Sequence, residues 1–282
     1  MNNFLIFITL GLLLISCNKN NSNNNSYRDD GEQKIKLQND SLHLPAKSLR
    51  LDHIFILIDS TNNIHQEFVN AGLTSAENWT SPHPQQGTIG EYFFFLNFYF
   101  EFLYISNSEE AIKNIENFGS NYVYRSKWKD SNFFPFGLGF VLNDSTKAIS
   151  FDTHSYKAEW MGKDNVFKMS KSNEDLNEPI VFVEPKEWAN EIFENIEQLQ
   201  TKENIEDIEY RRNNLGIKKL TKVILVIPKK EEQFSQTLNE LNGLENIEIK
   251  SGKEPLLVLE FDETEQKKEL DFEKKLRIKI KY

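Results

Sequence analysis

The folded part of the chain begins with a continuous β-branched and aromatic segment that has few polar residues: Leu51-Asp52-His53-Ile54-Phe55-Ile56-Leu57-Ile58. A run of this length and composition is typical of a strand that is buried on both faces. A short helical pattern follows over residues 64–69, and Gly72 is placed to end that helix. Two aromatic strands are predicted next, at Glu91–Leu96 and Phe98–Ile105. The first part of the chain therefore reads strand, helix, strands.

The C-terminal part of the sequence repeats this order. Leu220–Ile227 is predicted as a strand, and Glu231–Leu244 carries apolar residues at helical spacing. Further strands are expected at Ile247–Lys250, Leu256–Phe261 and Leu276–Tyr282. When the two parts are laid over each other, Leu51-Asp52-His53 falls on Leu220-Thr221-Lys222. We therefore expect an α+β fold in which two βαβββ modules, residues 48–105 and 218–282, form one curled mixed sheet.

The middle segment, residues 106–217, is expected to be inserted between the two modules. A helix is predicted near Glu109–Phe118 and a strand at Phe136–Leu142. Pro185–Leu199 places apolar residues on one helical face, so a helix is predicted there as well. Glu203–Asn214 is highly charged and is expected to form a solvated extension or loop.

The N-terminal residues have the features of an export signal. Residues 4–15 are almost entirely apolar and lead through Ser16 into Cys17, which is the single cysteine of the chain. This stretch is too short to span a bilayer, which takes roughly 20 residues, and it resembles the lipobox of bacterial lipoproteins. We expect residues 1–16 to be a signal peptide and Cys17 to carry the lipid. Residues 17–47 would then be a flexible tether, which places the protein at the cell envelope, most simply on the outer membrane.

Composition excludes several classes of function. With Cys17 used for lipidation, no thiol remains for a disulfide, a zinc–cysteine site or a cysteine nucleophile. The chain holds 33 Lys and Arg against 43 Asp and Glu, a net charge of −10. Binding to nucleic acid needs a basic surface, so we expect no nucleic-acid partner.

Two polar residues interrupt strands that are otherwise apolar. His53 shares a strand face with Leu51 and Phe55, and Glu101 shares one with Tyr99 and Leu103. A buried carboxylate is unfavourable unless it is hydrogen-bonded, paired or bound to a metal. If the two strands are neighbours, His53 and Glu101 converge on one cavity and begin a site for Zn²⁺, Mn²⁺ or Fe²⁺. The alternative is a core histidine bonded to Glu101 or to a carbonyl, without any metal.

Three segments resemble one family in their order and spacing: Leu51-Asp52-His53-Ile54, His83-Pro84-Gln85-Gln86-Gly87-Thr88 and Tyr99-Phe100-Glu101-Phe102-Leu103. They are similar to the glyoxalase-like branch of the vicinal oxygen chelate superfamily, over about 55 residues. That resemblance implies paired βαβββ modules curled around a metal-centred cavity. It also implies that His53 and Glu101 are metal ligands, with Glu101 as the catalytic group, and that His83 and Thr88 lie on the loop at the edge of the pocket.

The second module departs from that family. Its metal enzymes take further ligands from the second module, whereas here Lys222 stands at the place that matches His53. Residues 276–279 likewise supply no carboxylate to match Glu101. A third ligand would have to come from His83, His154 or Glu159, although a surface loop is the simpler interpretation of residues 154–160.

Three functions stay open on the sequence. The first is a divalent-metal enzyme that acts on a small, oxygen-bearing substrate. The second is a binding module that has lost the second-half ligands and captures a small apolar or aromatic molecule; Lys222 favours this one. The third is a structural partner in an envelope complex.

Overall fold

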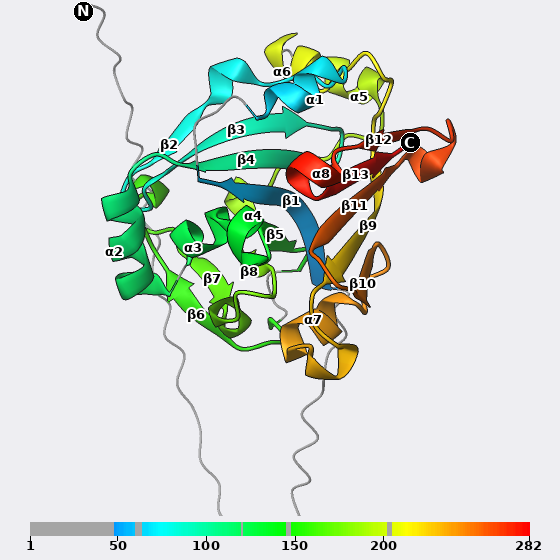
Figure 1. Cartoon of the computed structure of the whole chain (residues 1–282). Coiled ribbons are helices and arrows are strands. Elements are labelled where there is room, and N and C mark those ends of the chain that lie inside the picture. The colour runs from blue at the N-terminus through cyan, green and yellow to red at the C-terminus, as the bar shows by residue number, and fades with distance from the viewer. Residues whose placement is uncertain (1–47, 60–63, 120, 145–147, 202–204) are drawn as a thin grey trace, which may run out of the picture. The chain divides into compact units, whose positions relative to one another are not determined.

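The computed structural model of the chain contains two mixed β-sheets joined by short helices (Figure 1). The structure describes residues 48–282 apart from 60–63, 120, 145–147 and 202–204. The predicted signal peptide 1–16, the predicted lipid attachment at Cys17 and the predicted tether to residue 47 all lie outside the described residues. Within the described part, no helix has both the length and the apolar character needed to cross a membrane. The α+β class that the sequence predicts is confirmed.

The larger sheet has eight strands in the order β2-β3-β4-β1-β5-β8-β7-β6. Their bounds are β1 Leu49–Ile58, β2 Ser81–His83, β3 Thr88–Phe94, β4 Tyr99–Ile105, β5 Phe136–Leu142, β6 Thr153–Tyr156, β7 Phe167–Ser170 and β8 Ile180–Val183. At the centre β1 runs antiparallel to β5, with β4 parallel on the far side of β1 and β8 parallel on the far side of β5. The arrangement of β1 to β4 is thus repeated by β5 to β8.

The smaller sheet has five strands in the order β10-β9-β11-β13-β12. They are β9 Leu220–Ile227, β10 Ile247–Ser251, β11 Leu256–Phe261, β12 Glu269–Asp271 and β13 Ile278–Lys281. The prediction that Leu220–Ile227 shares one sheet with Leu51–Ile58 is therefore wrong. The place beside β1 is taken by β5. Because β9 alternates buried Val223, Leu225 and Ile227 with partly exposed residues, it has one apolar face and packs through that face.

Short helices connect the strands. They are α1 Gln66–Asn70, α2 Ser108–Phe118, α3 Tyr122–Ser126, α4 Trp128–Ser131, α5 Ile196–Gln200, α6 Ile205–Tyr210, α7 Gln236–Leu241 and α8 Glu273–Leu276. Single 3-10 turns occur at Glu77–Trp79, Glu159–Met161, Lys171–Glu174, Lys186–Trp188, Glu231–Gln233 and Asp262–Thr264. The predicted helix near Glu109–Phe118 is confirmed, with Asn107 as its N-cap and Gly119 in the left-handed conformation at its end.

One long predicted helix is wrong. Pro185–Leu199 forms a single turn at Lys186–Trp188, then extended chain, then α5. The backbone N–H of Asn190 bonds to Asp52, and that of Phe193 bonds to the carbonyl of Leu96. These bonds to other parts of the fold replace the helical ones, and Asn195 caps α5 as a separate helix.

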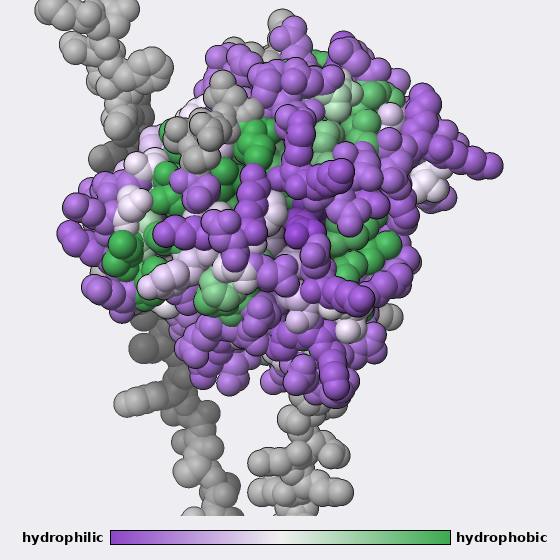
Figure 2. Space-filling model, in the orientation of Figure 1, coloured by the Kyte–Doolittle hydropathy of each residue, from purple (hydrophilic) through white to green (hydrophobic). Residues whose placement is uncertain are grey.

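Alternation along β1 sends its side chains into two different cores. Ile54 and Ile56 belong to a core shared with the smaller sheet, where they pack in one cluster with Leu225 and Leu257. Phe55 belongs to a second core on the other side of the larger sheet. The outer surface seen in Figure 2 is mostly hydrophilic, with separate hydrophobic patches. The smaller sheet thus covers one face of the larger sheet and leaves the Phe55 face for a cavity.

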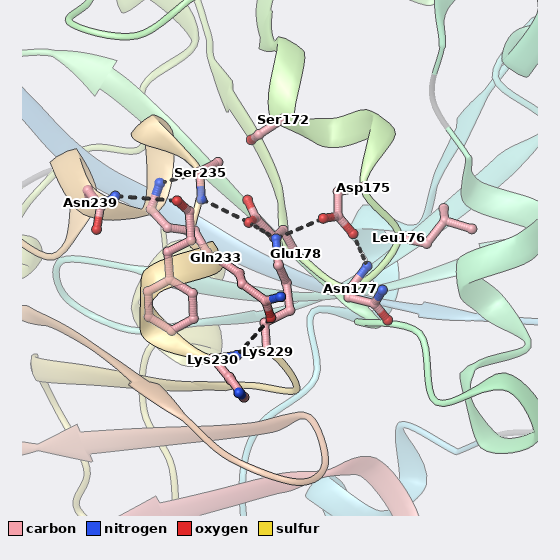
Figure 3. A network of polar contacts seen from close by, with 12 residues as sticks. Ser172, Asp175, Leu176, Asn177, Glu178, Lys229, Lys230, Gln233, Ser235 and Asn239 are labelled. Carbon is pink, nitrogen blue, oxygen red and sulfur yellow. Dashed lines mark hydrogen bonds and ion pairs between the residues drawn. The ribbon is translucent and has the colours of Figure 1, made fainter.

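Buried charges fasten the segment 173–178 before β8. Arg125 is fully buried and donates to the backbone carbonyls of Phe134, Asn173, Asp175, Leu176 and Glu178. Lys229, which follows β9, pairs with both Asp175 and Glu178 (Figure 3). The backbone N–H of Ser235 donates to the same Glu178 carboxylate. This network joins the chain around the smaller sheet to the loop that leads into β8.

Candidate functional site

A cavity of about 410 Å³ opens on the Phe55 face of the larger sheet. Its lining combines aromatic and polar side chains: His53, Phe55, Ser81, His83, Gln86, Tyr92, Tyr99, Glu101, Leu103, Tyr122, Trp160, Phe167, Phe182, Glu184 and Trp188. The size falls within the range of small-molecule sites, roughly 300–1,000 Å³. His53 pairs with Tyr99 across the parallel β1–β4 ladder, and Phe55 pairs with Glu101. The prediction that His53 and Glu101 face one cavity is confirmed.

Three glycines leave space for side chains that line this cavity. A Cβ on Gly139 of β5 would lie 2.3 Å from Cε1 of His53, and one on Gly137 would lie 2.1 Å from Cζ of Phe55. On β3, a Cβ on Gly90 would lie 2.3 Å from Oε1 of Glu101. Contacts below 3.0 Å are not tolerated, so these strands carry glycine where site residues lie flat against the backbone.

A β-bulge brings a further carboxylate to His53. The β1–β5 register shifts between Leu51 and His53, which leaves Asp52 as the extra residue. The bulge places Asp52 beside His53, where its Oδ2 lies 3.2 Å from Nδ1 of His53, although Asp52 itself does not line the cavity. Oε1 of Glu184, at the end of β8, lies 3.8 Å from the same nitrogen. One ligand atom from each of Asp52, His53 and Glu184 lies within 4.8 Å of the other two, and all three residues are buried.

The two carboxylates of this group have different surroundings. Burial alone would raise the pKa of Asp52, but the hydrogen bond and charge of His53, a hydrogen bond with Glu184 and the charge of Arg50 together hold that pKa below its usual value. Arg50 lies 3.5 Å from Oδ1 of Asp52, and the backbone N–H of Asn190 donates to the same oxygen at 2.7 Å. Burial and the charge of Asp52 raise the pKa of Glu184 well above its ordinary range. Among the described residues, Oε1 of Glu184 is buried without a hydrogen-bond partner.

These features fit a bound cation. A ligand set of one imidazole nitrogen and two carboxylate oxygens suits Zn²⁺, Mn²⁺ or Fe²⁺. Ligand bonds of about 2.0–2.2 Å require ligand atoms about 3–4 Å apart, which is close to the spacing around Nδ1 of His53. A positive ion would also relieve the repulsion between Asp52 and Glu184 and give the buried Oε1 a partner.

Glu101 lies on the same cavity wall but outside this three-residue group. Burial raises its pKa to about 7, although the charge of His53 and the hydroxyl of Tyr92 act against the rise. A carboxyl group with this pKa exchanges a proton near neutral pH, which is the property of a general acid or base. The geometry therefore separates Glu101, a buried carboxyl group with a raised pKa, from the set Asp52, His53 and Glu184.

The resemblance implies a loop position at the pocket edge for His83 and Thr88, but the structure places them on β2 and β3, and only His83 lines the cavity. Nδ1 of His83 lies 3.1 Å from Oγ1 of Thr88, and Trp160 packs on the imidazole with ring centroids 4.5 Å apart. Burial and the nearby His53 lower the pKa of His83 to about 4, so it is neutral at physiological pH. Thr88 is buried behind His83 and does not line the cavity itself.

The other ligands considered from the sequence lie elsewhere. Glu159 is exposed and bonds to Gln85, and His154 lies on β6 outside the cavity lining. Lys222 lies on the smaller sheet, where it pairs with Glu248 at 2.7 Å. Lys222 therefore does not replace a ligand of this cavity, and the prediction that it stands at the place matching His53 is wrong. The position opposite His53 in the larger sheet is Gly139.

Sequence reasoning missed both Glu184 and Asp52 as site residues. The apolar run Ile180–Val183 ends in Glu184 and Pro185, which is a strand with a carboxylate at its end. That signal was obscured because Pro185 was taken as the start of a helix. Asp52 was not recognised because the bulge at that position has no sequence signature.

Comparison with known proteins leaves the family open. No family model matches the chain, and no curated protein matches it. Among solved structures, a crystal structure described as a hypothetical protein from Staphylococcus aureus aligns with 83% of this chain and 99% of its own, at 14% identity and a TM-score of 0.46.

Proposed function

We propose that this protein binds a divalent metal ion through Asp52, His53 and Glu184 and uses it to act on a small, oxygen-bearing molecule. The observation that carries the proposal is the convergence of ligand atoms from these three buried side chains within 4.8 Å of one another, two of which, His53 and Glu184, line an open cavity. The repeated strand arrangement around β1 and β5 supports the resemblance to the vicinal oxygen chelate superfamily, with β5 to β8 in the role that the sequence assigned to residues 218–282.

The chain's own residues have distinct tasks in this proposal. Asp52, His53 and Glu184 hold the ion, and Asn190 and Arg50 fix one oxygen of Asp52 so that the other faces His53. When bound, the ion supplies Lewis-acid polarisation of a substrate oxygen. Glu101 takes up or releases a proton at its carboxylate, and its raised pKa suits it to both directions. The rings of Phe55, Phe167 and Phe182 supply apolar lining against which the substrate would pack.

A second candidate function is the capture of a small molecule without metal. Asp52 is already hydrogen-bonded to His53 and to the backbone N–H of Asn190. These bonds favour capture without metal, because they satisfy buried polar atoms of Asp52 without an ion. In that function the aromatic lining supplies most of the affinity, and His53 and Glu101 orient the ligand. We further propose that the protein is lipid-anchored at the cell envelope through Cys17.

A metal titration of three variants tests the first proposal. Wild-type protein should bind one equivalent of Zn²⁺ or Mn²⁺ in calorimetry. Glu184→Gln and Asp52→Asn each remove a ligand charge, so affinity should fall by about 100-fold or more, beyond the effect of losing an outer partner. Glu159→Gln is the matched control, because Glu159 is exposed and outside the cavity. Binding that is unchanged in Glu184→Gln would refute the metal site, and no binding at all would favour capture without metal.

A further inference from the structure

A second chamber of about 460 Å³ adjoins the cavity described above. Ser81, Tyr92, Tyr99 and Trp188 line both spaces, so the two meet along these side chains. Tyr99 is the link to the proposed metal ligands, because its ring stacks on His53 at 4.4 Å with an interplanar angle of 15°. We name the second space the outer chamber.

The walls of the outer chamber are mostly flat aromatic rings. Phe94 is central: its ring centroid lies 5.5 Å from that of Trp79, 6.0 Å from that of Tyr92 and 5.4 Å from that of Tyr99. Trp79 is 45% exposed, which is unusual for so large an apolar ring at the edge of a cavity. Rings at these spacings offer faces and edges for another ring to stack on.

The base of the outer chamber adds a flat guanidinium group. Arg211 lies 5.0 Å from the ring centroid of Phe94 and 5.2 Å from that of Phe193, and it donates to Oδ1 of Asn190 at 2.8 Å. The backbone N–H of Asn190 in turn donates to Asp52. Asn190 therefore contacts both Arg211, at the base of the outer chamber, and Asp52, a proposed metal ligand. These two contacts fix the outer chamber relative to the proposed metal ligands.

We propose that the outer chamber is a subsite for a planar aromatic group. Its rings, its volume and the exposed face of Trp79 fit a one- or two-ring system, while the inner cavity takes the oxygen-bearing end of the same molecule. Only the placement of the oxygen-bearing end in the inner cavity rests on the proposed metal function. The affinity of the outer chamber for an aromatic ring does not depend on a metal ion.

The test compares 2-naphthol with decahydro-2-naphthol, which has the same carbon skeleton without aromatic rings. Calorimetry on the purified full chain in the presence of a chelator should show saturable binding of 2-naphthol and clearly weaker binding of the saturated alcohol. Trp79→Ala should weaken 2-naphthol binding about three- to tenfold, the value of one stacking contact. Tyr124→Ala is the matched control, because Tyr124 is 55% exposed and lines neither space.

Three results would overturn the proposal: no binding of 2-naphthol, equal affinity for both alcohols, or equal effects of Trp79→Ala and Tyr124→Ala. The metal proposal fails separately. Glu184→Gln should leave 2-naphthol affinity within about twofold of wild type while it removes metal binding. Loss of metal binding in Trp79→Ala would instead show that the outer chamber acts only by supporting the inner site, which contradicts an independent aromatic subsite.

Discussion

Gly139→Ala offers a sharp test of how the site is built. The new Cβ would lie 2.3 Å from Cε1 and 2.7 Å from Nε2 of His53. The imidazole has little room to retreat, because Tyr99 stacks on it at 4.4 Å and Phe182 packs against it at 5.5 Å. Overpacking of this kind costs about 1–3 kcal/mol of unfolding free energy, and the confinement of His53 favours the upper half of that range. The melting temperature should fall by about 4–12 °C.

A double-mutant cycle identifies the cause. In a His53→Ala background the clash has no partner, so the penalty of Gly139→Ala should fall below about 0.5 kcal/mol. Gly243→Ala is the control, since its Cβ would come no closer than 3.2 Å to the carbonyl oxygen of Glu240. Urea unfolding followed by circular dichroism measures the four proteins of the cycle and the Gly243→Ala control. The zinc affinity of the Gly139→Ala single variant should drop about 10- to 100-fold. An equal penalty in both backgrounds would refute the role assigned to Gly139.

Three further predictions concern the buried cation, the buried acid and the anchor. Arg125→Met removes the donor that now satisfies the buried carbonyls of Phe134 and Asn173, so it should lower the unfolding free energy by more than about 3 kcal/mol in urea. Exposed Lys127→Met should stay within about 0.5 kcal/mol, and similar values for both variants would contradict this role. Because burial raises the pKa of Glu101 from 4.5 to about 7, its stabilising contribution in metal-free protein is complete below pH 4.5, declines as pH rises and is gone above about pH 7. The unfolding free energy of wild type should therefore fall relative to that of Glu101→Gln as pH rises from 4.5 to about 7, and the difference should be constant outside those limits. A constant difference within those limits would show that the pKa of the Glu101 carboxyl is not raised. Cys17→Ser should abolish labelling by radioactive palmitate and leave uncleaved or mislocalised precursor, and normal labelling with normal membrane fractionation would argue against lipidation.

Local pattern was enough for the central strands. The apolar run that contains His53 and the aromatic run that contains Glu101 are recognisable as strands, and period-two alternation correctly places His53 with Phe55 and Glu101 with Tyr99 and Leu103. The shared face predicted for His53 and Leu51 is wrong, because the bulge at Asp52 sends Leu51 to the opposite core. The pairing of distant strands was not recognisable. Residues 136–142 and 220–227 both read as strands, and only packing decides that the first, with Gly137 and Gly139 against Phe55 and His53, lies beside β1.

The candidate site was predictable to the same extent. His53 and Glu101 come from strands whose sequence signals are strong, and both line the cavity. His83 also lines it, but from the short strand β2, where the sequence predicts a loop. Asp52 enters through a bulge, and Glu184 enters through a short strand that precedes a proline, so neither follows from periodicity. The error at Lys222 has the same origin, because it assigned the second half of the repeat to the wrong strands.

The most direct test of the metal site is an anomalous difference map from crystals of the protein grown with Zn²⁺ and measured at the zinc edge. We predict one strong peak about 2.0–2.2 Å from Nδ1 of His53 and from carboxylate oxygens of Asp52 and Glu184. The same map from Glu184→Gln crystals should lose that peak. A map without a peak between these three residues, or with zinc bound only at surface carboxylates, would contradict the account.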